Sequence, residues 1–139
     1  MILQCRACGR QNRVPASRID DGPKCGGCKT ALTVDAPVNL ATEAEFDEIV
    51  SGSPRPVLVD FWASWCAPCR MVAPEVVKLA GQYAGRLVVA KLSTEEVPSI
   101  AARFGIHSIP TLALFSGGRE VNRISGAMPA SAIAQRLGL

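Results

Sequence analysis

The sequence is poor in aromatic residues and has no long apolar run. Aromatic side chains make up 5% of the 139 residues, and none lies within residues 1–35. No apolar stretch approaches the roughly 18 residues of a membrane span. Met1 to Gln4 lead directly into Cys5 without the pattern of a signal peptide. We therefore expect a soluble, cytoplasmic protein that makes no contact with a membrane.

The charge of +3 lies entirely in the N-terminal segment. Residues 1–35 carry six basic and three acidic side chains, and the remaining nine of each sign cancel. Such a basic segment could bind nucleic acid, but it has no aromatic side chain to stack on bases. Four metal-bound thiolates around one Zn²⁺ would also add about −2 to this segment. The sequence therefore argues against nucleic acid as a partner.

Six cysteines form three Cys-x-x-Cys pairs, and two of these pairs lie in the N-terminal segment. Sixteen residues separate the second cysteine of one pair from the first of the other, which is the spacing of a four-cysteine zinc site. The ligands are Cys5, Cys8, Cys25 and Cys28. Glycines beside both pairs, Gly9 and Gly26-Gly27, allow tight turns that aim N–H groups at sulfur. We expect one structural zinc ion, with paired disulfides or free thiols as the alternatives, because so short a segment buries too little apolar surface to fold alone.

The third pair, Cys66 and Cys69, follows an apolar run and precedes a segment with helical spacing. Two thiols in the first turn of a helix can close a disulfide, and the free N–H groups of that turn stabilise a thiolate. We expect Cys66, at an exposed edge, to be the nucleophile and Cys69 to be the resolving thiol. Pro68 fits the first turn, where a missing N–H costs nothing.

Asp60 interrupts an apolar strand predicted over Val57 to Trp62. A carboxylate in a buried strand is costly unless it is paired or protonated, and desolvation should raise its pKa. Such a group suits a general base. A core ion pair with Lys91 is the structural alternative.

The remaining pattern predicts alternating strands and helices that end in a hairpin and a helix. A capping box at Thr42 to Glu45 opens a helix that continues to about Val50, and Gly117-Gly118 turns one strand of the hairpin into the next. Val34 to Pro37 is the expected linker. We therefore predict a metal-binding module over residues 1–35 and an α/β domain over residues 36–139.

The residues around the third pair closely resemble the active-site segment of the thioredoxins, namely Val57 to Ala63 followed by Trp65-Cys66-x-Pro68-Cys69. The resemblance covers roughly residues 38–139 and implies the thioredoxin fold, a mixed sheet between helices. Cysteine pairs ahead of such a domain resemble a zinc-containing bacterial type of thioredoxin. In this chain Ala67 replaces the glycine commonest in the motif, which affects the redox poise.

The resemblance also implies roles for residues outside the dithiol. Ile109-Pro110-Thr111 matches the segment with a cis-proline that docks substrate backbone, and Gly126 matches a glycine that leaves room for the same backbone. Trp65 would lie at the rim of the site. The lone histidine, His107, would be a solvated loop residue near the docking segment. Asp60 and Lys91 occupy the places of a buried carboxylate and a nearby lysine.

The function implied is reduction of protein disulfides by a monomer that holds zinc but no organic cofactor. Electrons would come from NADPH through thioredoxin reductase, and disulfide-containing proteins would be the clients. The zinc site is expected to be sensitive to oxidants, because zinc-bound thiolates remain nucleophilic. The alternative function is a zinc-dependent binding module or a redox-regulated chaperone.

Overall fold

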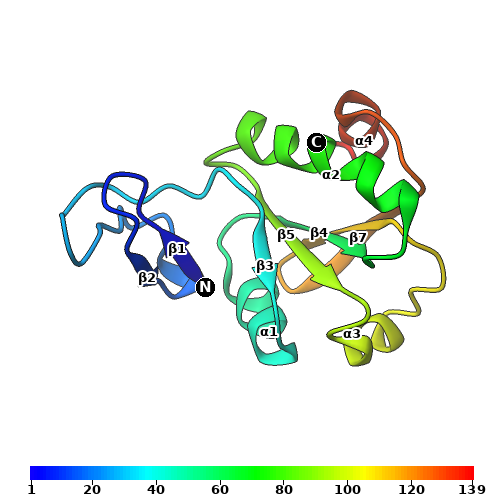
Figure 1. Cartoon of the computed structure of the whole chain (residues 1–139), viewed down its shortest axis with the longest axis horizontal. Helices are drawn as coiled ribbons and strands as arrows, with labels where there is room; N and C mark the ends of the chain where they lie inside the picture. Colours follow the sequence, from blue (N-terminus) through cyan, green and yellow to red (C-terminus); the bar gives the residue numbers. More distant parts are fainter.

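Apolar strands and amphipathic helices arrange residues 1–139 into a small N-terminal hairpin beside a five-stranded sheet, as the computed structural model shows (Figure 1). The N-terminal segment holds β1 (Ile2–Gln4), β2 (Gln11–Arg13) and the 3₁₀ helix η1 (Ala16–Arg18). The strands of the larger sheet are β3 (Val38–Leu40), β4 (Val57–Trp62), β5 (Val88–Ser93), β6 (Thr111–Ser116) and β7 (Arg119–Ser125). Its helices are α1 (Glu43–Gly52), α2 (Ala67–Gln82), α3 (Pro98–Arg103) and α4 (Ala130–Leu137). None of these helices is long and apolar enough to cross a lipid bilayer.

The larger sheet is mixed, with the strand order β3-β5-β4-β6-β7. Strand β4 runs parallel to β5 and antiparallel to β6, so it is paired on both sides. Helices α2 and α4 cover one face of the sheet, and α1 and α3 cover the other (Figure 1). The predicted mixed sheet between helices is therefore confirmed.

Alternation along β4 determines which face each side chain meets. Val57 and Phe61 pack into the cluster that contains α1, whereas Leu58 packs against α2 and α4. Successive side chains of a strand point to opposite faces, so Asp60 points to the same face as Leu58. Its carboxylate thus lies on the side of the sheet that α2 covers.

Helix α1 begins as the capping box predicts. The Thr42 hydroxyl accepts the N–H of Glu45 at 3.1 Å. In return, the Glu45 carboxylate accepts the N–H of Ala41 at 2.7 Å, one residue before the cap itself. The first of these bonds satisfies an N–H group that the first turn leaves free.

The N-terminal segment packs directly on α1 and does not extend away from the domain. Its buried residues, among them Leu3 and Ile19, form one continuous apolar cluster with Ile49 and Val50 of α1. The Glu48 carboxylate accepts the N–H of Ala16 at 3.0 Å. The predicted linker takes part in this packing, because Val34 is buried in the same cluster. The module boundary at residues 35 and 36 remains a prediction, but no gap in the apolar packing marks it.

Candidate active site and candidate metal centre

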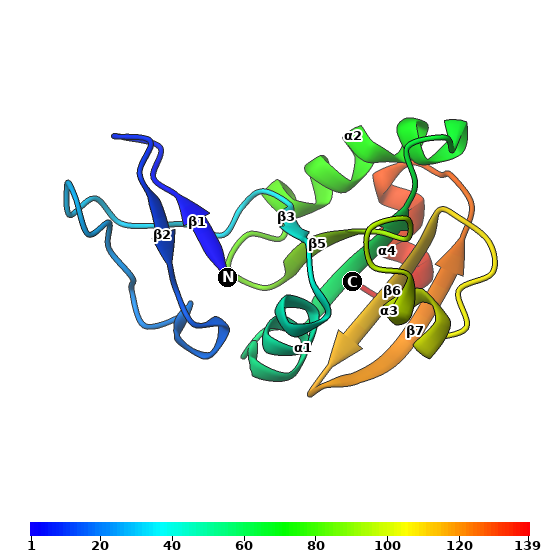
Figure 2. The same ribbon diagram turned by 60° about the horizontal axis from the view of Figure 1, so that its bottom comes forward.

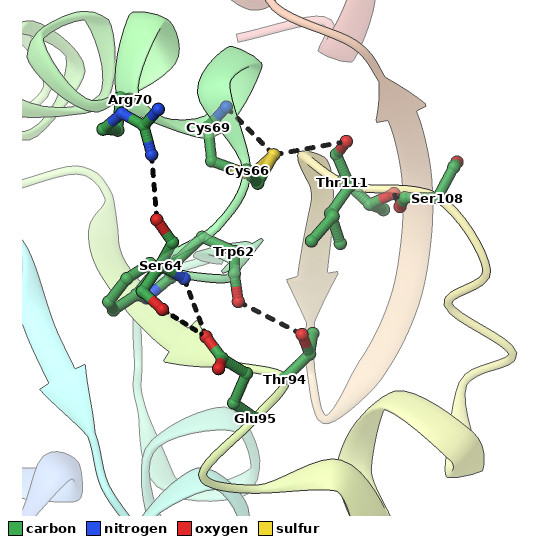
Figure 3. The surroundings of a disulfide bond; sticks show 10 residues. Trp62, Ser64, Cys66, Cys69, Arg70, Thr94, Glu95, Ser108 and Thr111 are labelled. Carbon is green, nitrogen blue, oxygen red and sulfur yellow. Dashed lines mark hydrogen bonds between the residues drawn. A yellow bond between two sulfur atoms is a disulfide. The ribbon is translucent and has the colours of Figure 1, made fainter.

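Cys66 and Cys69 form a disulfide at the start of α2, with 5.3 Å between their Cα atoms. Cys66 is the N-cap residue, and its sulfur accepts the N–H of Cys69 at 3.2 Å (Figure 3). A helix start offers such free N–H groups and a positive dipole end, both of which favour a thiolate. Pro68 lies in the first turn, as predicted.

The expected exposure of Cys66 was wrong for this disulfide form. Both cysteines are 3% exposed, so accessible area does not distinguish nucleophile from resolving thiol. They pack with Ala63 and with the partly buried Trp62 and Ile109 in a small cluster of their own. What distinguishes Cys66 is the N–H bond to its sulfur and its position facing Ile109, whose carbonyl oxygen lies 3.7 Å from that sulfur.

The docking segment contains the one cis peptide bond, between Ile109 and Pro110. Gly126 donates its N–H to the carbonyl of Pro110 at 2.9 Å, which joins the two segments. Gly126 has a φ of +98°, and a Cβ built there meets no atom within 4 Å. The space beside it is open, and its backbone conformation favours glycine. The structure thus brings together the dithiol and both segments that the sequence assigned to substrate docking.

Trp65 lies beside the dithiol with 70% of its surface exposed. An indole with so much of its surface exposed contributes little to a core. His107 is exposed, as expected for a solvated loop residue.

A clamp that the sequence did not reveal holds the segment before Cys66 (Figure 3). The Glu95 carboxylate accepts the N–H and the hydroxyl of Ser64, each at 2.8 Å. Arg70 donates to the carbonyl of Ser64, also at 2.8 Å. The Ser64 N–H, followed by its hydroxyl, lowers the pKa of Glu95.

Asp60 is fully buried, and neither of its carboxylate oxygens has a hydrogen-bond partner. Desolvation raises its pKa to about 6, although the charge of Lys91 opposes that shift. Lys91 is the β5 neighbour of Asp60 in the sheet register. The Lys91 ammonium lies 5.2 Å from the centre of the Trp62 ring. Asp60 and Lys91 form no ion pair within 4 Å, although the charge of Lys91 acts on Asp60. A direct Asp60–Lys91 ion pair therefore does not explain the buried carboxylate.

The four N-terminal cysteines converge in the second candidate site. Their sulfur atoms all lie within 4.8 Å of one another. The sulfurs of Cys5 and Cys28 are 3.5 Å apart, and those of Cys8 and Cys25 are 3.6 Å apart. A tetrahedron with Zn–S bonds of about 2.3 Å has edges of about 3.8 Å, so the sulfur cage fits a zinc ion.

The turns that carry the two N-terminal cysteine pairs have the same hydrogen-bond pattern. Gly9 donates its N–H to the carbonyl of Cys5 at 2.8 Å, and Lys29 donates to that of Cys25 at 3.0 Å. Gly9 has a φ of +79° and Lys29 one of +65°, so the left-handed position of the second turn falls on a lysine and not on the Gly26-Gly27 pair. The N–H of Gly27 points at the Cys25 sulfur at 3.3 Å. The N–H groups of Cys28 and Gly27 lower the pKa of Cys25 to about 6.

Known proteins with this arrangement are redox enzymes. The family model described as Thioredoxin matches residues 37–138, and the model described as Thioredoxin 2, N-terminal, a zinc ribbon, matches residues 4–30. The chain therefore belongs to the thioredoxin family. Thioredoxins are thiol-disulfide oxidoreductases, and this chain combines their fold, their dithiol and an N-terminal zinc-ribbon module.

Individual relatives agree with this assignment. The chain is 44% identical over 128 residues to Thioredoxin C-3 of Corynebacterium nephridii, covering 92% of this chain and 87% of that protein. It is 50% identical over 96 residues to Thioredoxin 1 of Nostoc sp., covering 69% and 90%. Among solved structures, a mutant thioredoxin from Halobacterium salinarum matches with a TM-score of 0.68 and 34% identity, covering 74% of this chain and 88% of that one.

Proposed function

We propose that the protein reduces disulfides of client proteins, with Cys66 attacking and Cys69 resolving. The observation that carries this assignment is the position of Cys66 at the N-cap of α2, where its sulfur accepts the Cys69 N–H. The same N–H would stabilise a Cys66 thiolate, while Cys69 lies one turn deeper in the helix. Backbone groups at Ile109 and Pro110, the open space at Gly126 and the exposed ring of Trp65 would receive the substrate chain.

The chemistry consists of two thiol-disulfide exchanges. The Cys66 thiolate attacks one sulfur of the client disulfide, a mixed disulfide forms, and the first client thiolate leaves. Cys69 then loses its proton and attacks the Cys66 sulfur, which releases the second client thiolate and leaves Cys66 and Cys69 as a disulfide. Two electrons pass to the client, and NADPH restores them through thioredoxin reductase.

Asp60 is the proposed base for the second exchange. It lies under α2, it has no hydrogen-bond partner, and its pKa of about 6 makes it a proton acceptor near neutral pH. Lys91, beside it in the register, moderates that pKa by its charge.

We further propose that the four N-terminal cysteines hold one zinc ion as a structural element. Bound zinc would supply folding free energy to a segment that has little apolar surface of its own. A chromogenic chelator should detect one zinc per chain after the protein is denatured.

Trapping of intermediates tests the division of labour between Cys66 and Cys69. The Cys69→Ser variant should accumulate covalent complexes with oxidised insulin or other disulfide proteins, because its mixed disulfide cannot resolve. The Cys66→Ser variant is the matched control and should trap few. Non-reducing electrophoresis followed by mass spectrometry measures both, and equal trapping would overturn the assignment.

An insulin-reduction assay with NADPH and thioredoxin reductase separates a reductase from a zinc-dependent binding module, since the latter would show no turnover.

A further inference from the structure

A groove of about 710 Å³ lies between the N-terminal segment and the edge of the larger sheet. One wall is the hairpin face formed by Ile2, Gln11 and Arg13, and the other is strand β3 with the chain that leads into it. Both views show the β1–β2 hairpin beside β3 and α1 (Figures 1 and 2). We call this cavity the inter-module groove.

The β3 wall of the inter-module groove is an unpaired strand edge. Strand β3 pairs with β5 alone, in parallel register, and is the first strand in the sheet order. No backbone group of Val38, Asn39 or Leu40 bonds to any segment other than β5. A strand edge of this kind presents N–H and C=O groups in the spacing that an added strand needs.

Most charged groups in the groove already have a partner. Asp35 pairs with Arg6, Glu48 accepts from the Met1 ammonium and from the Ala16 N–H, and Glu45 accepts the Ala41 N–H.

Four polar lining side chains have no such partner, namely Gln11, Arg13, Thr33 and Asn39. Arg13 is the one charged side chain among them. Ile2, which is 42% exposed, adds an apolar contact beside it.

We propose that the inter-module groove binds an extended peptide segment of a partner protein, which adds as a strand to the free edge of β3 and places an acidic side chain against Arg13. The groove extends along all three residues of β3. Main-chain bonds to the edge would give affinity, and the Arg13 contact would give selectivity.

This site is separate from the dithiol. Strand β3 is the edge opposite β7, whereas the docking segment at Ile109 and Pro110 leads into β6 on the other side of β4. A peptide without cysteine can therefore occupy the groove without thiol chemistry, and the proposal stands or falls independently of the reductase assignment.

Peptide binding to the full-length, zinc-loaded protein, with Cys66 and Cys69 joined as a disulfide, tests the proposal. The probe is a fluorescein-labelled, end-blocked heptapeptide of alternating threonine and valine with a central aspartate, and its partner carries lysine at the centre. Fluorescence polarisation should show saturable binding of the aspartate peptide, with the lysine peptide at least tenfold weaker. Amide NMR shifts should concentrate on β3 and the β1–β2 hairpin.

Charge reversal sharpens the test. Arg13→Glu should weaken the aspartate peptide at least tenfold and strengthen the lysine peptide. Arg18→Glu is the matched control, because Arg18 is exposed in the same segment, pairs with Asp21 and does not line the groove; it should change neither affinity more than about twofold. Equal affinity of the two peptides for wild type, or NMR shifts confined to Trp65 and Ile109, would overturn the proposal.

Discussion

The two halves of the molecule use one motif, Cys-x-x-Cys, for opposite purposes. In the domain, strand β4 delivers Cys66 to the start of a helix, and the helix places Cys69 close enough to form a disulfide. In the N-terminal segment, each pair sits on a tight turn, and no disulfide joins its members. The sulfurs of each pair instead face those of the other pair.

The same Cys-x-x-Cys spacing occurs in both halves, so the local backbone conformation, and not the spacing, determines whether a pair suits disulfide exchange or metal binding. A helix start supplies N–H groups to one sulfur and favours exchange of a disulfide. A turn directs two sulfurs outward at a shared point and favours a metal. The stability of the two halves should differ for the same reason, because the domain has two large apolar clusters and the N-terminal segment joins only one of them.

Oxidation should separate the two halves most strongly. Mild peroxide that joins even one N-terminal pair removes two of the four ligands and should release the metal. Metal binding contributes on the order of 10 kcal/mol to small zinc-dependent folds, so residues 1–35 should unfold while the domain stays folded. A chromogenic chelator measures zinc release, and amide hydrogen exchange reports on each half.

After the reductase restores the dithiol, insulin reduction should return. Metal that stays bound at peroxide doses that fully oxidise Cys66 and Cys69 would show that the site is inert scaffold. Loss of protection in both halves at once would show that they fold as one unit.

Removal of the N-terminal segment also tests whether the two halves fold separately, with a smaller expected effect on stability. A chain that starts near Pro37 should fold and reduce insulin, since the capping box, the sheet and the dithiol lie beyond that point. It should nevertheless lose on the order of 3 kcal/mol, the cost of uncovering one or two large apolar side chains, because Ile49 and Val50 would lose contacts with the cluster. Urea unfolding measures this loss. A truncated chain that does not fold would contradict the prediction of two modules.

The sequence predicted the parts of the molecule that local patterns determine. Strand β4, the helix that follows Cys66 and the Gly117-Gly118 hairpin are where periodicity and turn residues place them. The four-cysteine cage followed from spacing. The cis bond before Pro110 followed from resemblance alone, since local sequence does not determine it.

Features that depend on distant residues were not predictable in this way. Ser64 meets Glu95 across 31 positions, and Ala16 meets Glu48 across 32. Neither pair leaves a periodic or local signal, because only the folded chain brings the partners together. The near-identical burial of Cys66 and Cys69 also depends on a distant residue, since Ile109 packs against both from a loop at least forty residues further on.

Replacement of Asp60 by asparagine should change stability and catalysis in opposite directions. A carboxyl whose folded pKa is about 6, above the ordinary value of 3.8, keeps its proton more tightly in the folded state. Folding is therefore favoured below pH 4 and loses stability as the pH rises from 4 to 6, by about 3 kcal/mol in total. Asp60→Asn removes this loss, so it should be more stable than wild type at pH 7 and similar at pH 4.

The same variant should release the mixed disulfide more slowly near pH 7, because Cys69 has lost its base, and should recover as the pH rises and the thiol ionises unaided. Denaturant titrations and stopped-flow reduction of insulin measure the two effects. Asp21→Asn, an exposed carboxyl paired with Arg18, is the control and should change neither. Unchanged turnover across pH would leave Asp60 without a role as base.

The smallest effect should come from the left-handed residue of the second metal-binding turn. Lys29 is the one residue other than glycine with a positive φ, and the equivalent position of the first turn is Gly9. Glycine adopts this conformation without the Cβ clash that costs about 1 kcal/mol. Lys29→Gly should therefore slow zinc loss to a chelator by up to about fivefold, because the folded turn no longer carries that strain.

Lys29→Ala separates backbone strain from the side chain. It removes the bond from the Lys29 ammonium to the carbonyl of Gly26, which is 3.3 Å long, but keeps the Cβ and hence the strain. We expect this variant to lose zinc at the wild-type rate or slightly faster. The Gly9→Ala variant introduces the same strain into the first turn and should lose zinc faster than wild type. If glycine and alanine at position 29 behave alike, the positive φ costs nothing there, and the two turns would differ in sequence without differing in energy.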